Sequence, residues 1–174
     1  MNRELLESGT PGGCTATVVY VEGAECWVAN VGDTRVCVVG ADGAAVRATV
    51  DHRPDVAAEA AAVRARGGFV TRFGGGAARV NGVLAVTRAL GDREVADVIS
   101  STPDVARAAF GAGGRATLVL ACDGLWDYVA DDTVAALLAA AGNEREAAET
   151  LRNYAYAHDS TDNISVLVIR PRKD

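Results

Sequence analysis

One apolar run, from Ala116 to Cys122, constrains the fold more than any other segment of this chain. It reads A-T-L-V-L-A-C and carries no charge. The run is about as long as one β-strand and far shorter than the roughly 20 residues of a membrane-spanning helix. A strand that is apolar on both faces belongs inside a covered sheet. The sequence therefore predicts a central strand at Thr117–Cys122.

Four segments before residue 51 are rich in β-branched residues and are separated by Gly-containing turns, a pattern typical of antiparallel hairpins. These strands are predicted at Thr15–Val21, Cys26–Val31, Val36–Val39 and Val46–Val50. The turns between them are predicted at Glu22–Glu25, Gly32–Thr34 and Ala41–Gly43. Together they predict an antiparallel meander. Later strands are predicted at Val83–Val86, Val105–Phe110 and, mostly buried, Ile164–Ile169.

Two segments in the middle and later parts of the chain have helical signals at both ends. Asp55–Arg66 has acidic residues early and basic residues late, and a Gly pair follows it, as the helix dipole and C-cap rules favour. From Val134 to Ala141 the apolar residues follow the i, i+3, i+4, i+7 spacing of an amphipathic helix. We expect Asp132 to be its N-cap and Gly142 to stop it.

A further helix is predicted at Glu144–Ala157, with Leu151 and Tyr154 facing inward. Strands come first in this chain and most of the helices come late, which favours an antiparallel sheet with packed helices. No repeat or linker divides the sequence. We therefore expect an α+β layered fold and a single domain over residues 1–174.

The charges and cysteines limit the classes of partner. The chain has 17 Lys and Arg against 23 Asp and Glu, a formal net charge of −6, and its positive charges are scattered. We therefore expect no nucleic acid and no membrane among its partners. The four cysteines form no CxxC pair, and three of them lie in apolar stretches where a free thiol behaves as a small hydrophobe. This predicts a reducing compartment, cytoplasmic or nuclear.

Three aspartates, Asp33, Asp123 and Asp162, share one setting. Each lies where an apolar strand meets a loop, beside Gly or a small polar residue. Three converging carboxylates would repel one another and raise each pKa unless a cation lay between them. Oxygen-only ligation suits Mg²⁺ or Mn²⁺. An isolated Asp at a strand end is more often a turn or cap residue, and spacing alone does not show that the three meet.

Seven segments, in order over almost the whole chain, carry a more specific signal. Arg79–Asp92 reads R-V-N-G-V-L-A-V-T-R-A-L-G-D, Ala29–Arg35 reads A-N-V-G-D-T-R, and Ala121–Asp127 reads A-C-D-G-L-W-D. The other four are Gly9–Thr15, Asp51–Pro54, Arg64–Val70 and Ser160–Ile164. These segments closely resemble the ordered motifs of the protein phosphatase 2C family, the metal-dependent (PPM-type) serine/threonine phosphatases.

The resemblance implies an α-β-β-α sandwich of two antiparallel sheets flanked by helices, here incomplete. It also implies hydrolysis of phosphoserine and phosphothreonine in proteins by water that Mg²⁺ or Mn²⁺ activates. By motif match, Asp123 and Asp162 would be catalytic as ligands of the catalytic metal pair. Asp33, with Asp123, would contribute to a third metal site. Residues 55–81 would form the flap beside the active site.

Other residues that match the family's motifs are expected to have structural roles. Arg88 and Asp92 are expected to pair with each other or to cap a loop. His52 is expected to be a packing or hydrogen-bonding residue rather than a catalytic acid. His158 matches no motif, and we expect it at the surface or at the edge of the core.

The chain also departs from the family's pattern. The family's D-G-H-G-G motif, whose Asp bridges two metals, occurs nowhere in the 174 residues, nor do the first strands and the first two helices. An N-terminally truncated domain is therefore expected, and two-metal catalysis should fail without the bridging carboxylate. The absent helices predict an exposed apolar sheet face that favours self-association or a partner. Two interpretations stay open: part of a working phosphatase, or a non-catalytic pseudophosphatase that binds phosphoproteins or regulatory partners.

Overall fold

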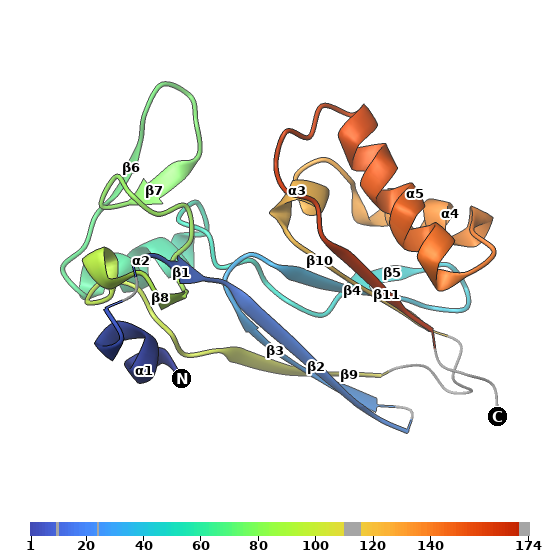
Figure 1. Cartoon of the computed structure of the whole chain (residues 1–174), viewed down its shortest axis with the longest axis horizontal. Coiled ribbons are helices and arrows are strands. Elements are labelled where there is room, and N and C mark those ends of the chain that lie inside the picture. The colour runs from blue at the N-terminus through green and yellow to red at the C-terminus, as the bar shows by residue number, and fades with distance from the viewer. Residues whose placement is uncertain (10, 24, 110–115, 171–174) are drawn as a thin grey trace. The chain divides into compact units, whose positions relative to one another are not determined.

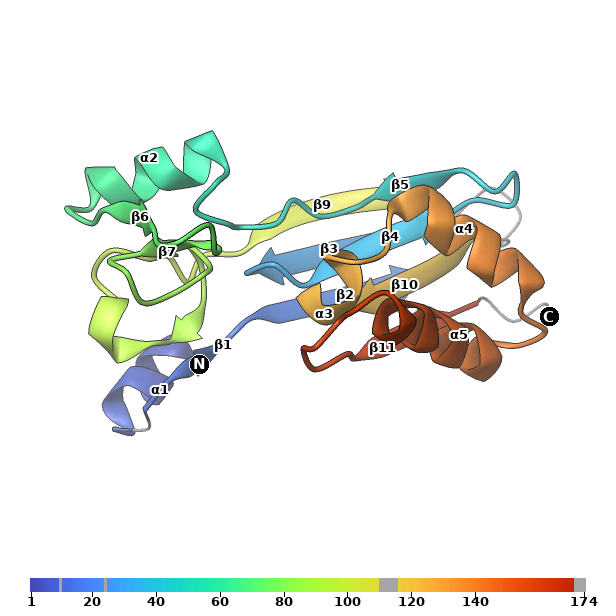
Figure 2. The same ribbon diagram turned by 90° about the horizontal axis from the view of Figure 1, so that it is seen from above.

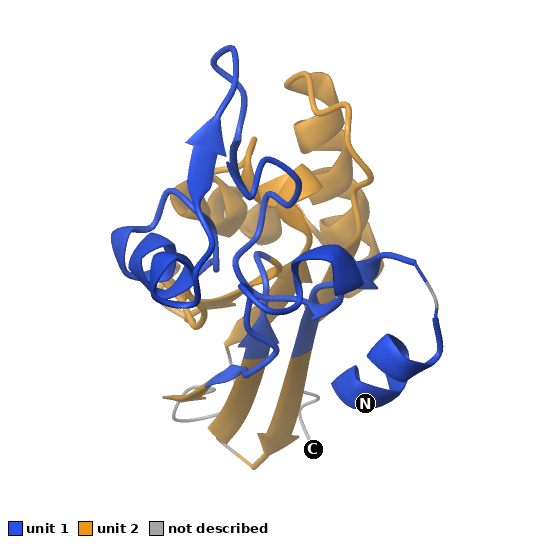
Figure 3. Cartoon of the chain, turned by 90° about the vertical axis from the view of Figure 1, so that its left-hand side faces the viewer, with its two compact units in different colours: residues 1–17, 30–33, 51–104 blue, residues 18–29, 34–50, 105–174 orange. Residues whose placement is uncertain are grey.

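The computed structural model describes residues 1–9, 11–23, 25–109 and 116–170. The chain divides into two compact units, coloured blue and orange in Figure 3. Unit 1 comprises residues 1–17, 30–33 and 51–104, and unit 2 comprises residues 18–29, 34–50 and 105–174. Several strands pass from one unit to the other along the chain, so each unit is assembled from separate segments. We describe each unit by itself.

Unit 2 is built on two sheets. The first has four strands in the order β11-β10-β4-β5, with bounds β4 (Arg35–Val39), β5 (Ala45–Arg47), β10 (Thr117–Ala121) and β11 (Val166–Ile169). The second has the order β2-β3-β9, with bounds β2 (Ala16–Glu22), β3 (Glu25–Val31) and β9 (Asp104–Ala109). Ala16 and Thr17 of β2, Asn30 and Val31 of β3, and Asp104 of β9 are assigned to unit 1.

Strand β10 is central in the four-stranded sheet, as its apolar run predicted. It pairs antiparallel with β11 on one side and with β4 on the other, so that Val119 lies between Val168 and Cys37. Leu118 and Val119 point to opposite faces and are both fully buried. The strand is covered on both faces because each face packs against another layer.

The early strands do not form a single meander, and that prediction was wrong. Strands β2 and β3 belong to one sheet, whereas the next hairpin, β4–β5, belongs to the other. Cys26 and Val28 of β3 share one buried cluster with Val36 and Val38 of β4. The two strands therefore face each other across the sandwich. Both strands carry apolar residues, and stacking the sheets buries these residues better than side-by-side pairing would.

Three helices cover the other face of the four-stranded sheet, as Figures 1 and 2 show. They are α3 (Asp123–Trp126), α4 (Asp131–Ala140) and α5 (Glu144–Ala157), the last with the predicted bounds. Leu125, Val134 and Leu151, one from each helix, are fully buried against this sheet. Unit 2 is therefore an α-β-β stack, which agrees with the expected α+β fold of antiparallel sheets and flanking helices.

The outer face of the sheet β2-β3-β9 is apolar and exposed, as predicted. Val18 is 63% exposed, Tyr20 59% and Val105 67%. Trp27 lies between them. Its ring centroid is 5.8 Å from the Tyr20 ring centroid and 5.7 Å from the guanidinium carbon of Arg107. We call Val18, Tyr20, Trp27 and Val105 the outer sheet face.

Unit 1 consists of short elements around a small apolar core. They are α1 (Asn2–Glu7), β1 (Gly13–Cys14), α2 (Ala57–Ala65), β6 (Val70–Arg72), β7 (Ala78–Val80), β8 (Leu90–Gly91) and the 3₁₀ helix Arg93–Val95. Strands β6 and β7 form a hairpin, and β1 pairs antiparallel with β8. Val63 of α2 and Val80 of β7 are fully buried in the core. The α2 helix and this hairpin lie within residues 55–81.

Several predicted boundaries were wrong for local reasons. Val83–Val86 is not a strand, because Asn81 and Gly82 both have positive φ and turn the chain, and only Leu84 forms an isolated bridge. The strand predicted at Val46–Val50 ends at Arg47. Beyond it, the Val36 N–H donates its hydrogen bond to the Thr49 side-chain hydroxyl, at 3.0 Å, rather than to a strand carbonyl.

Three further differences concern the starts of two helices and the exposure of one strand residue. The N-cap of α4 is Ala130 rather than Asp132, and α2 begins at Ala57 rather than at residue 55. Leu167 of β11 is exposed because β11 is an edge strand. Ala24 of a predicted turn and Phe110 of a predicted strand lie outside the described residues. No helix in the described part of the chain has both the length and the apolar character to cross a membrane.

Candidate active site

Asp123 lies at the end of the central strand β10. It is the first residue of α3, and its Oδ1 accepts a hydrogen bond from the Gly124 N–H at 3.0 Å. Trp126 anchors this short helix, because its indole Nε1 donates to the Ala121 carbonyl at 2.8 Å and its ring packs 5.1 Å from the Arg35 guanidinium carbon. The buried strand and the Trp anchor together set the position of the Asp123 carboxylate.

Asp162 lies in the loop between α5 and β11. Its Oδ1 accepts the Asn163 N–H at 2.6 Å. Ser160, buried at the start of this loop, donates its hydroxyl to the Gly124 carbonyl at 2.8 Å. The loop that carries Asp162 is therefore tied to the first turn of α3, next to Asp123.

Gly124 and Cys122 hold these two loops together. A Cβ at Gly124 would lie 2.2 Å from the Asn163 carbonyl oxygen, far inside van der Waals contact, and 3.4 Å from the Asp162 Cβ. The Cys122 thiol donates to the Asn163 carbonyl at 3.0 Å, and its Sγ accepts the Ser165 N–H at 3.2 Å. The structure thus places Asp123 and Asp162 on adjoining loops of unit 2. Their joint binding of a metal stays a prediction.

Asp33 belongs to unit 1 and follows the end of β3. Its side chain is buried, and its Oδ2 accepts a hydrogen bond from Nε of Arg53 at 3.0 Å. Arg53 stands where the family's motif has Lys. The Arg53 contact fixes the direction of the Asp33 side chain. Unit 1 therefore holds Asp33 as an ordered carboxylate, and its role as a metal ligand stays a prediction.

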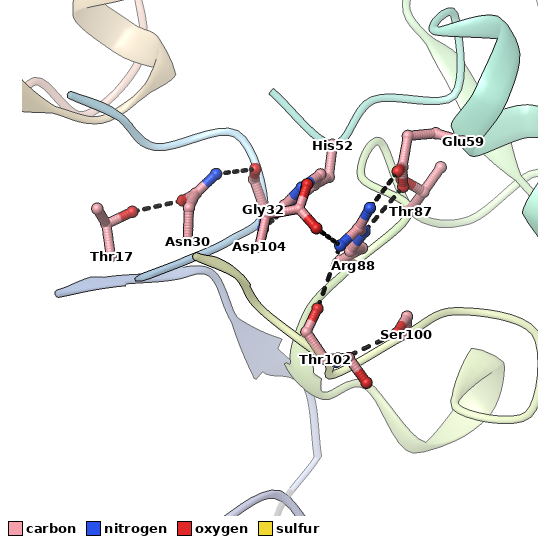
Figure 4. Close-up of polar contacts among 10 residues, drawn as sticks. All are labelled: Thr17, Asn30, Gly32, His52, Glu59, Thr87, Arg88, Ser100, Thr102 and Asp104. Carbon is pink, nitrogen blue, oxygen red and sulfur yellow. Dashed lines mark hydrogen bonds and ion pairs between the residues drawn. The ribbon is translucent and has the colours of Figure 1, made fainter. Parts of the chain in front are cut away.

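Gly32, next to Asp33, has both its backbone N–H and its backbone carbonyl hydrogen-bonded (Figure 4). The Gly32 N–H donates to Nδ1 of His52 at 3.0 Å, and the Gly32 carbonyl accepts from the Asn30 side-chain amide at 3.1 Å and from the His52 N–H at 3.0 Å. Gly32 has φ +106°, and a Cβ there would lie 2.2 Å from Thr15 Cγ2. Only Gly fits this turn. His52 is a buried hydrogen-bonding residue, in agreement with the expectation.

Arg88 does not pair with Asp92, which was one of its two expected roles. In the other expected role it caps a loop, because its Nη1 donates to the Thr102 carbonyl at 3.3 Å. Its guanidinium forks over Glu59 of α2, with Nη2 to Oε1 at 2.5 Å and Nε to Oε2 at 3.1 Å, and its Nη1 donates to Asp104 at 2.6 Å (Figure 4). Asp92 lies instead in a left-handed conformation at φ +48°, beside Gly13. Burial raises the pKa of Asp92.

The two carboxylates that contact Arg88 are both shifted toward the ionised form. Burial alone would raise the pKa of Glu59, but hydrogen bonds from Arg88 and Thr87 outweigh it and hold the pKa below its ordinary value. The pKa of Asp104 is lowered first by the hydrogen bond from His52 and then by Arg88. The Glu59 contact also raises the pKa of Arg88. These groups therefore form a charged cluster within unit 1.

The donor set of unit 2 fits a hard divalent cation with few protein ligands. Within the described residues, no three His, Cys, Asp or Glu side chains gather as a complete metal cage. Asp123 and Asp162 nevertheless supply two carboxylates on adjoining loops. Mg²⁺ usually keeps several waters and binds through one or two carboxylates. The residues present therefore fit such an ion.

Sequence reasoning missed Glu59, Asp104 and Cys122. Glu59 looked like an ordinary acidic residue in the first turn of a helix, and Asp104 like a charge at the start of a strand. Cys122 stands where the family's motif has Ser, which was the one available signal for a hydrogen-bonding role. Their partners lie at least 16 residues away in sequence, beyond the reach of a local pattern.

Comparisons with known proteins identify the family. The family model described as protein phosphatase 2C matches residues 2–164. Probable protein phosphatase 2C 44 of Oryza sativa subsp. japonica is 42% identical over 175 residues, which cover 98% of this chain and 54% of that protein. Protein phosphatase 2C homolog 1 of Schizosaccharomyces pombe is 36% identical over 163 residues, covering 90% and 45%.

Solved structures agree with the sequence comparison. A C. elegans sex-determining protein superposes with a TM-score of 0.85 at 28% identity, over 97% of this chain and 42% of that one. A phosphatase of Toxoplasma gondii superposes with a TM-score of 0.76 at 31% identity, over 84% and 48%. The chain thus spans about half the length of the relatives that it matches. On the matched motifs, the family model and the shared fold, the chain belongs to the protein phosphatase 2C family.

Proposed function

We propose that this chain carries part of the active centre of a metal-dependent phosphatase that acts on phosphoserine and phosphothreonine in proteins. The family is metal-dependent, and the observation that carries the proposal is the contact between Gly124 and Asn163, which keeps Asp123 and Asp162 on adjoining loops. These two carboxylates would hold Mg²⁺ or Mn²⁺, with Asp33 contributing to a further site. The chemistry that such an ion supplies is a water of lowered pKa for attack on phosphorus.

The residues around the two carboxylates orient them rather than react. The N–H of Gly124 binds Oδ1 of Asp123, and the N–H of Asn163 binds Oδ1 of Asp162. Each of these hydrogen bonds fixes the direction of one carboxylate oxygen. Cys122 and Ser160 fix the distance between the two loops. This chain's own contribution is thus a pre-ordered pair of anionic oxygen ligands.

Manganese binding is the direct test of the site. Isothermal titration of the chain with Mn²⁺ should show binding that Asp123→Asn and Asp162→Asn each weaken by at least about 10-fold. Asp132→Asn is the matched control, because Asp132 is an exposed carboxylate of α4 in the same unit. Equal affinity in all four proteins would overturn the assignment of the two ligands.

Turnover distinguishes the two candidate functions. Hydrolysis of p-nitrophenyl phosphate is measured with and without Mn²⁺ for the chain and for Asp123→Asn. Manganese-dependent turnover that the substitution abolishes supports the phosphatase. Manganese binding without turnover, together with binding of a phosphoserine peptide, supports the alternative of a pseudophosphatase.

The outer sheet face supports a second part of the proposal, a covering layer. Three large apolar side chains on one sheet are each more than half exposed, and such patches mark interaction surfaces. We expect the layer to come from a second copy of this chain or from another polypeptide with an apolar surface. A concentration series in analytical ultracentrifugation separates these sources, because only self-association depends on the concentration of this chain alone.

A further inference from the structure

His52 is almost fully buried, at 1% exposure, and both of its ring nitrogens are used. Nδ1 lies 3.0 Å from the Gly32 backbone nitrogen, and Nε2 lies 3.1 Å from Oδ2 of Asp104. A backbone N–H can only donate, so Nδ1 has to accept and cannot carry a proton. The ring proton is therefore on Nε2, where it is donated to Asp104. The geometry selects one neutral tautomer.

Asp104 is itself fixed by a second contact. Its Oδ1 accepts a hydrogen bond from Nη1 of Arg88 at 2.6 Å, and its Oδ2 accepts a hydrogen bond from Nε2–H of His52. Arg88 is in turn held by the fork on Glu59, and Thr87 donates its hydroxyl to Glu59 at 2.5 Å. A continuous line of hydrogen bonds thus runs from α2 to Gly32, all within unit 1 (Figure 4).

We propose that His52 is a positioning residue for Asp33: as the Nε2–H tautomer selected by Asp104, it holds the Gly32 N–H and so sets the direction in which the Asp33 carboxylate leaves the turn. The proposal rests on the proposed role of Asp33 as a metal ligand. It extends that role to a charged line, Glu59–Arg88–Asp104–His52, that ties the ligand to helix α2. Groups that orient metal ligands in this way are commonly worth 10- to 100-fold in metal affinity.

The tautomer is tested on the unmodified chain. The chain has only two histidines, so ¹⁵N NMR of the imidazole nitrogens gives two sets of signals, and a His158→Gln variant assigns them. At neutral pH His52 should show a protonated Nε2 and an unprotonated Nδ1. A protonated Nδ1, or rapid exchange between the two tautomers, would overturn the proposal without any need for a variant at His52.

A matched pair of substitutions tests the positioning. In His52→Asn the side-chain oxygen can replace Nδ1 as the acceptor, whereas in His52→Gln the side-chain amide can replace only the Nε2 donor. Hydrogen exchange of the Gly32 amide should therefore stay slow in His52→Asn and become at least about 10-fold faster in His52→Gln, since the amide loses its hydrogen-bond acceptor there. Equal exchange rates in the two variants would contradict the proposal.

Metal affinity provides the second readout. Asp33→Asn should weaken Mn²⁺ binding. His52→Gln should weaken the same binding by about 10-fold, whereas His52→Asn should retain it. His158→Gln is the control, because His158 is exposed at the end of α5, where its ring stacks on Tyr154 and bonds the Tyr154 carbonyl. If Asp33→Asn leaves Mn²⁺ binding unchanged, the metal role of Asp33 fails, and the tautomer and exchange results still decide whether His52 positions the turn.

Helix α2 provides the far end of the line. Arg88→Lys keeps the charge but cannot form the fork on Glu59 together with the contact to Asp104. This variant should speed exchange at Gly32 and weaken the preference of His52 for the Nε2–H tautomer. Unchanged tautomer and exchange in Arg88→Lys would limit the positioning unit to His52 and Asp104 and would contradict the connection to α2.

Discussion

The Cα of Gly124 and the carbonyl of Asn163 are so close that a single added methyl group would lie 2.2 Å from the oxygen. This contact joins the loop that carries Asp123 to the loop that carries Asp162. Gly124→Ala should therefore push the loops apart, lower the free energy of unfolding by about 1–3 kcal/mol and weaken Mn²⁺ binding. Chemical denaturation and Mn²⁺ titration measure both effects. Gly142→Ala is the control, because among the described residues its Cβ would meet just the movable Glu146 carboxylate, at 3.1 Å.

Cys122 should act through its two hydrogen bonds rather than through its volume. Cys122→Ser can keep both the donor and the acceptor, whereas Cys122→Ala loses both and should lower the free energy of unfolding by about 1 kcal/mol. Urea unfolding compares the two variants, and Cys14→Ala controls for loss of an exposed thiol. A Cys122→Ala variant as stable as Cys122→Ser would show that the thiol does not clamp the loops.

Glu59 should make the stability of unit 1 depend on acid pH. Its pKa in the folded chain lies below the ordinary value of 4.5, so the unfolded state binds a proton first as the pH falls. The stabilisation by Arg88 is therefore present above about pH 4.5 and is lost as the pH falls through the folded-state pKa. Thermal unfolding measured from about pH 7 down to about pH 3 should show a shallower fall in Tm for Glu59→Gln than for the unmodified chain. Parallel curves would rule out Glu59 as the titrating group.

The outer sheet face should determine the association state. Val18→Thr with Val105→Thr keeps β-branched residues on the strands while removing apolar surface. This double variant should bind less hydrophobic dye and show a lower apparent mass in sedimentation than the unmodified chain. Leu167→Thr is the control, because Leu167 is 53% exposed on an edge strand of the other sheet. An equal change with the control would assign the association to general hydrophobicity.

Local patterns were sufficient wherever one segment decided the outcome. The run at residues 117–122 predicted β10, and the helix predicted at Glu144–Ala157 is α5 at its observed bounds. They were insufficient for Val83–Val86, which has strand-forming residues but follows two residues with positive φ. In the region from β2 to β5 the sequence pattern likewise indicated where the strands are. It did not indicate which sheet each strand joins, because pairing depends on what else each face can bury.

The amino-acid sequence by itself determined the family, the strand and helix classes of most segments, and three aspartates as candidate ligands, because motifs and periodicity are properties of neighbouring residues. Only the tertiary structure decided that Arg88 pairs with Glu59 and Asp104, that Cys122 bridges two loops, and that His52 holds Gly32. These contacts join residues 16 to 43 positions apart. A side chain can make a hydrogen bond only with a group about 3 Å away, and packing of the whole chain decides which group that is.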